Sequence, residues 1–109
     1  MTTSLPLLCE PRLDLEPPDV TEAVSMAALL ADRTRASILA MLQGGPHCVC
    51  ELAAAIGERE NNVSNHLARL RDAGLVRASR HEANARFLYY ERDEKAIAVA
   101  RVALSEVLG

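Results

Sequence analysis

The sequence predicts a mainly α-helical domain with one β-hairpin, in the element order α-α-α-α-β-β-α. Half of the 109 residues are apolar, but only one Phe, two Tyr and no Trp occur, so the core must be built from aliphatic side chains, which favours helices. Apolar residues recur at helical spacing through most of the chain. Near residue 80, two short runs flank a turn and contain the β-favouring residues Val76, Phe87 and Tyr89, and this pattern indicates a hairpin.

The N-terminal arm is expected to span residues 1–18, which contain Pro6, Pro11, Pro17 and Pro18, no sustained periodicity, and Cys9. Residues 19–109 are expected to form one domain. Its small core would gain stability from dimerisation.

Two helices are expected at the start of the domain. The first runs from Asp19 or Thr21, either of which can cap it, to about Leu30. The second runs over residues 34–43, is capped by Asp32, and has Ile38 and Leu42 facing inward.

A short third helix is expected over residues 49–56, because its apolar residues share one face and Gly57 follows as a C-terminal cap. Cys48 and Cys50 lie at its start. On a regular helix they would point in different directions, so they can share a ligand only if Cys48 is still in extended chain. The amide groups at a helix start favour the thiolate, which is the form that binds metal.

A fourth helix follows and is expected to end at Ala73 and Gly74. Its buried stripe is Val63, Leu67 and Leu70, which leaves an outer face rich in amides. Asn can pair bidentately with adenine and Arg with guanine in the major groove of DNA. The third and fourth helices therefore predict a helix-turn-helix. The candidate DNA-contacting residues on the fourth helix are Asn61, Asn62, Ser64, Asn65, His66 and Arg69.

Residues 75–81 and 85–90 are expected to pair as a hairpin, which would add a wing to the helix-turn-helix. Arg80 and Arg86 near its tip can reach phosphate groups, and a solvated charged turn is the equally weighted alternative. From Asp93 a last helix carries apolar residues at helical spacing. Because such a helix needs a partner, the first and last helices are predicted to form a homodimer interface.

The net charge of −3 is unevenly distributed. Residues 1–32 carry one Arg against six acidic residues, whereas residues 59–86 carry six Arg against three acidic residues, a net charge of +3. The local field steers a partner, so the total charge does not argue against DNA.

No run of about 18 apolar residues and no basic-then-apolar N-terminus occurs, so a cytoplasmic protein without a membrane partner is expected. Three cysteines are an odd number. This count argues against a disulfide framework and leaves thiols available to metal ions.

Several motifs together resemble the ArsR/SmtB family of metal-responsive winged-helix repressors over residues 20–108. The similar segments are DRTR at 32–35, CVCEL at 48–52, NVSNHL at 62–67 and LARLRDAGLV at 67–76. The resemblance implies a homodimer that binds an inverted repeat in double-stranded operator DNA and is released by a metal ion.

Within the family, Cys9 resembles the arm cysteine of the cadmium/lead-sensing branch, which reaches the thiolate box of the other protomer. Cys9, Cys48 and Cys50 would then form a three-sulfur site suited to Pb(II) or As(III), whereas Cd(II) would need a fourth ligand. Zn(II) is a further candidate ion. Leu13 replaces the branch's second arm cysteine, and Ala53 replaces the third cysteine of common arsenic sensors. The candidate fourth ligands are Glu10, Asp14 and His47.

The family's zinc site on the last helix is predicted to be absent, because only Asp93 remains of its ligands. The sequence thus predicts a metal-sensing transcriptional repressor. A thiol-based redox-responsive repressor is the alternative, and three unrelated thiols that only help to pack the helix are a further one. An enzyme is not expected, since no partner base lies at a recognisable spacing from a cysteine.

Overall fold

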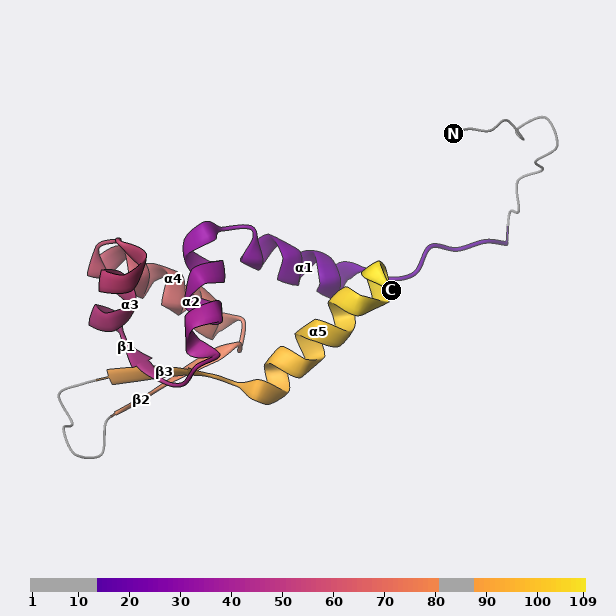
Figure 1. The fold of residues 1–109 in the computed structure, drawn as a ribbon. Helices are drawn as coiled ribbons and strands as arrows, with labels where there is room; N and C mark the ends of the chain where they lie inside the picture. The colour runs from indigo at the N-terminus through magenta and orange to yellow at the C-terminus, as the bar shows by residue number, and fades with distance from the viewer. Residues whose placement is uncertain (1–13, 81–87) are drawn as a thin grey trace.

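The computed structural model describes residues 14–80 and 88–109 and shows a mainly helical fold with a small sheet (Figure 1). The predicted fold class, a winged helix-turn-helix, is confirmed. None of the helices in the described chain is both long and apolar enough to cross a membrane. The elements, in chain order, are α1 (Thr21–Leu30), α2 (Arg33–Leu42), β1 (His47–Cys48), α3 (Val49–Ile56), α4 (Glu60–Asp72), β2 (Val76–Arg80), β3 (Leu88–Arg92) and α5 (Glu94–Leu108).

The core lies where α4 packs against α2, α3 and β2. Each helix contributes the apolar stripe that its sequence spacing predicts, because residues three and four apart share a helical face. Burial of these side chains is the main force that holds the three helices together. The largest fully buried side chains are Ile38, Leu52, Leu67, Leu70 and Val63.

The sheet is antiparallel with the strand order β1-β3-β2. Strand β1 was not predicted, because a two-residue strand has no periodicity; its His47 and Cys48 pair with Tyr90 and Tyr89. Strand β3 ends two residues later than the predicted residue 90, because Arg92 pairs with Val76 of β2. The start of the predicted second strand, residues 85–87, lies outside the described residues.

Side-chain caps define the starts of α2 and α5, and the cap at Asp32 was predicted from the sequence. Asp32 accepts a hydrogen bond from the Arg35 N–H at 3.0 Å, and Asp93 accepts one from the Ala96 N–H at 3.1 Å. Helix α1 differs from the prediction, since its N-cap position is Val20, which has no polar side chain. Asp19 instead accepts from the Thr21 N–H at 3.0 Å, so it still satisfies an unpaired amide of the first turn.

Helices α1 and α5 contact each other at one end of the molecule, away from α3 and the hairpin (Figure 1). Residues 15–20, which precede α1, form neither helix nor strand and leave the domain at this same end. The thiol-bearing junction of β1 and α3 lies at the opposite end.

Candidate nucleic-acid interface and thiol site

The turn between α3 and α4 is fixed by backbone geometry. Gly57 adopts φ 82°, in the left-handed region that favours glycine, and so ends α3. The N–H groups of Gly57 and Glu58 both donate to the Ala53 carbonyl, at 2.9 and 3.1 Å. Arg59 is extended, and α4 begins immediately after it. This tight connection sets the angle between the two helices.

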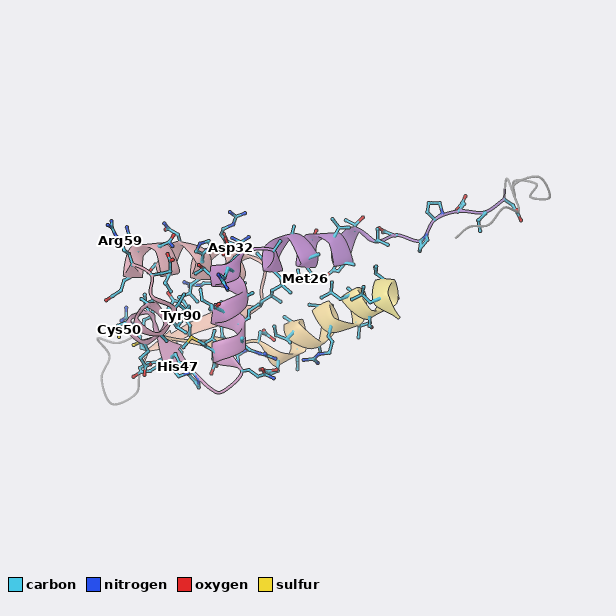
Figure 2. The ribbon with its side chains drawn as sticks, turned by 45° about the horizontal axis from the view of Figure 1, so that its top comes forward. Met26, Asp32, His47, Cys50, Arg59 and Tyr90 are labelled. Atoms are coloured by element: carbon cyan, nitrogen blue, oxygen red, sulfur yellow. The ribbon has the colours of Figure 1, made fainter. Side chains whose placement is uncertain are left out.

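Helix α4 presents an exposed polar face. Asn61, Ser64, Asn65 and Arg69 are exposed, as the sequence predicts, while the opposite stripe is buried. Figure 2 shows α4 along one edge of the molecule, with Arg59 at its start and nitrogen-ended side chains directed away from the body. An exposed helix with this chemistry can enter the major groove of DNA.

Two of the predicted DNA-contacting residues instead have partners within the protein. The Asn62 amide donates a hydrogen bond to the Glu58 carboxylate. His66 is half-buried, and its Nδ1 lies 3.2 Å from the guanidinium of Arg35 and 3.8 Å from Asp32. Asn61, Ser64, Asn65 and Arg69 are therefore better placed to read bases than Asn62 and His66.

The hairpin places Arg80 at the end of β2, where it is exposed. The other predicted wing contact, Arg86, lies outside the described residues. Arg77 is engaged within the sheet, since its Nε donates to the Glu91 carboxylate at 2.9 Å and its guanidinium lies 3.6 Å from Asp93. In the described part of the hairpin, Arg80 is thus the cation nearest the tip.

The two box cysteines are brought together as the sequence requires. Cys48 is the N-cap residue of α3 and has extended backbone angles, and Cys50 is in the first turn. The two thiols are close enough to interact, since the Cys50 thiol raises the pKa of the Cys48 thiol. Cys48 is buried, whereas Cys50 is exposed. A soft ion could therefore approach from the Cys50 side.

Glu51 and His47 surround the thiols. The Glu51 carboxylate accepts a hydrogen bond from the Cys48 N–H at 3.0 Å and lies 3.5 Å from His47 Nδ1. The Cys48 N–H lowers the pKa of the Glu51 carboxyl, and His47 lowers it further. In Figure 2, His47 and Cys50 lie at the same end of the molecule as Tyr90.

The helix start does not make Cys48 a thiolate, contrary to the expectation from sequence. The Glu51 N–H faces the sulfur and lowers the pKa of the Cys48 thiol, but burial raises this pKa by more, and the adjacent Cys50 thiol raises it as well. Burial disfavours the charged form because the protein interior solvates a thiolate poorly. A metal ion that binds here must therefore displace a proton from Cys48.

The donor set suits a soft ion but is incomplete within the described chain. Two adjacent thiols are ligands that Cd(II), Pb(II), As(III) and Zn(II) accept. Among residues 14–80 and 88–109, no three potential ligands are clustered closely enough to hold an ion. Cys9 and Glu10 lie outside the described residues. Asp14 is described and lies in the segment that precedes α1.

The arrangement of α3, the tight turn, exposed α4 and hairpin defines a winged helix-turn-helix protein. Residues 32–78 match the family described as bacterial regulatory protein, arsR family. The match covers the helix-turn-helix region, where most of the motifs that resemble the ArsR/SmtB family lie. The matched family is described as regulatory proteins, which agrees with the prediction of a transcriptional regulator.

The chain is similar to two curated regulators. It is 39% identical over 54 residues to the arsenical resistance operon repressor of Escherichia coli. The aligned region covers 49% of this chain and 46% of the relative. It is 50% identical over 50 residues to the HTH-type transcriptional regulator CmtR of Mycobacterium tuberculosis. This aligned region covers 46% of this chain and 42% of the relative. The chain thus spans about half the length of the curated relatives that it matches.

A solved structure extends the similarity beyond the helix-turn-helix. The crystal structure titled "Possible transcriptional regulator for arsenical resistance" is 29% identical to this chain, with a TM-score of 0.67. The alignment covers 75% of this chain and 82% of that one. The agreement supports the arrangement of helices and hairpin described above.

Proposed function

We propose that this protein is a transcriptional repressor that binds operator DNA as a metal-free homodimer and is released by a thiophilic metal ion. The observation that carries the proposal is the position of Cys48 and Cys50, whose thiols meet where α3 begins. Helix α3 leads through the Gly57 turn directly into α4. A ligand at the thiols therefore acts on the element that holds the exposed DNA-reading face.

The dimer interface is assigned to α1 and α5. The exposed large apolar side chains gather mainly on these two helices or just before them, and a monomer would leave them in water. A two-fold dimer through this face would place two copies of α4 on successive major grooves and select an inverted repeat. The exposed apolar residues on this face are Val20, Val24, Val99, Val102, Val107 and Leu108.

The complete metal site is proposed to join Cys48 and Cys50 of one protomer with Cys9 of the other. Residues 15–20 leave the domain at the end opposite the β1/α3 junction of the same protomer. This direction favours donation of the Cys9 ligand to the partner protomer. Three thiolates suit Pb(II) and As(III), and a fourth ligand from Glu10, Asp14 or His47 would suit Cd(II). The relative from Escherichia coli is named for arsenical resistance, which supports As(III) as a candidate.

Metal and DNA oppose each other in this scheme. Allosteric coupling is typically about 1 to 3 kcal/mol, or roughly 5- to 150-fold in affinity. By linkage, DNA weakens metal binding by the same factor as metal weakens DNA binding.

The decisive experiment is a titration of the reduced protein on its own upstream DNA with Cd(II), Pb(II), As(III) and Zn(II). Fluorescence anisotropy follows release, and ultraviolet thiolate-to-metal absorption counts sulfur ligands. We expect release by at least one soft ion together with a three-sulfur band. Tight DNA binding without release by any ion would reject metal sensing.

Variants separate the ligands from the scaffold. Cys48→Ser and Cys50→Ser should bind DNA normally but should resist release, and Cys9→Ser should lose one sulfur from the absorption band. Ala54→Ser is the matched control, because Ala54 is an exposed residue of the same helix. Release of either box variant at the metal concentration that releases the control would refute the assigned site.

A thiol-based redox repressor is the second candidate, favoured by the contact between Cys48 and exposed Cys50. Hydrogen peroxide would oxidise two thiols to a disulfide and would itself be reduced to two water molecules. Release by peroxide in the presence of a chelator, reversed by dithiothreitol, would favour this function over metal sensing.

A further inference from the structure

Arg35 is a charged residue of α2 whose side chain is buried. It is 8% exposed, and in α2 it shares the inward face with Ile38, Leu39 and Leu42. Its Nε donates to the Leu29 carbonyl at 2.6 Å, and one terminal nitrogen lies 3.5 Å from the Ala28 carbonyl. The guanidinium therefore binds the C-terminal end of α1, where carbonyl groups lack partners within the helix.

The other terminal nitrogen of Arg35 reaches α4. It lies 3.2 Å from Nδ1 of His66. An arginine does not lose its proton in proteins, so Arg35 must be the donor and His66 Nδ1 the acceptor. One rigid guanidinium thus joins α1 to α4 across α2.

The Arg35 guanidinium constrains the orientation of α4 relative to α1 as well as the distance between these helices. The donors of a guanidinium lie in one plane at fixed angles, so the carbonyls of α1 and the imidazole of α4 cannot move independently without losing a hydrogen bond. A buried donor that loses its acceptor is costly, which holds both contacts in place. Asp32 lies 3.8 Å from the same imidazole nitrogen and caps α2, so the start of α2 is tied to the same cluster.

We propose that Arg35 and His66 are positioning residues, which fix the direction of α4 relative to α1 and so set the half-site spacing that the dimer reads. This inference rests on the proposed function, because it takes α1 as part of the dimer interface and α4 as the DNA-reading helix. His66 then contributes to DNA recognition from behind α4 rather than through base contacts.

The test compares spacing preference among variants at His66. His66→Asn keeps an acceptor oxygen close to the place of Nδ1, His66→Gln moves the acceptor further out, and His66→Leu removes it. The probe is the inverted-repeat duplex that the unaltered protein selects from a random duplex library. Matched duplexes carry one or two base pairs more or fewer between the half-sites.

We expect the unaltered protein and His66→Asn to prefer the selected spacing by on the order of tenfold or more. His66→Leu and His66→Gln should bind all spacings with nearly equal affinity while they still discriminate the half-site sequence. A general loss of stability would lower binding to every duplex alike and would leave the ratio between spacings unchanged. The ratio therefore reports position rather than folding.

Three results would overturn the inference. The first is an unchanged spacing ratio in His66→Leu, and the second is the same spacing ratio in His66→Asn and in His66→Gln. The third is that the unaltered protein selects no duplex. The second comparison decides the matter if circular dichroism shows that His66→Leu does not fold. If the unaltered protein selects no duplex at all, the proposed function fails first, and this inference fails with it.

Discussion

At the residue scale, Cys48 combines three roles. It pairs with Tyr89 through β1, it begins α3, and it carries a buried thiol that contacts Cys50. The extended conformation of Cys48 is the one that the sequence requires if the two thiols are to share a ligand. The sequence could not show that burial outweighs the helix start, because burial depends on β3, which lies some forty residues further along the chain.

The raised pKa of Cys48 predicts a loss of stability at alkaline pH. When a thiol has a higher pKa in the folded state, its contribution to stability is complete below the unfolded pKa. This contribution is lost as the pH rises through the folded value. The unfolding free energy of the reduced protein should therefore fall more steeply above about pH 9 than that of Cys48→Ala. Urea unfolding over a pH series checks this, and parallel curves would contradict it.

Arg35 shows what sequence reasoning missed at this scale. Its position shares a helical face with Ile38 and Leu42, and a charged residue at an inward position is a signal for a buried polar partner. The partner itself was not predictable from spacing. His66 lies 31 residues away on another helix, and only the packed fold brings the two side chains together.

At the element scale, α4 was predicted almost completely, because its stripe and its outer face are both properties of local spacing. Gly74 also marked the end of α4 in the sequence. Gly74 has φ 81°, and the N–H of Leu75 donates to the Leu70 carbonyl at 3.0 Å, so the chain turns sharply into β2. In contrast, β1 has only two residues, and its identity as a strand comes entirely from its pairing with β3.

The DNA-reading role proposed for α4 predicts a loss of sequence discrimination in Asn65→Ala and Arg69→Ala. Each should reduce the preference for operator over scrambled DNA by about 1 to 3 kcal/mol, the value of a bidentate base contact. Arg71→Ala is the control, since it removes the same charge from the same helix at the edge of the buried stripe. Competition binding measures the preference, and equal losses in Arg69→Ala and Arg71→Ala would indicate charge effects alone.

The turn after α4 predicts that Gly74→Ala lowers the free energy of unfolding by about 1 kcal/mol, because the backbone of a residue with a side chain rarely adopts a positive φ. Gly44→Ala is the matched control. Its added Cβ would lie 3.6 Å from the Met41 carbonyl oxygen, an ordinary contact, and its φ is not in the left-handed range. Thermal unfolding compares the two variants. Equal melting temperatures would mean that the turn tolerates a side chain.

At the scale of the whole molecule, the arrangement of elements followed the family resemblance more than the composition. Apolar periodicity in α1 and α5 indicated an interface, and the structure leaves Val99 and Val102 of α5 59% exposed. Sequence spacing could not distinguish a face that packs inside one chain from a face that packs against a second copy. That distinction depends on which side chains remain uncovered after α1 and α5 have met.

The proposed dimer interface predicts that Val102→Lys is monomeric, because the change places a charge in the apolar face. Without a second α4 on the same duplex, operator affinity should fall by on the order of 10²-fold. Ala54→Lys is the control, since Ala54 is exposed on α3 at the other end of the molecule. Sedimentation equilibrium gives the oligomeric state. A dimeric Val102→Lys would place the interface elsewhere.

The position of Cys48 at the end of β1 also has a consequence for amide hydrogen exchange. In the described part of the chain, strand β1 occupies one edge of the sheet and pairs with β3, the central strand, which in turn pairs with β2 of the hairpin. Opening of β1 therefore exposes amides of β3 to solvent. An ion that immobilises Cys48 should slow exchange along both strands, so protection would spread from the thiols into the base of the wing.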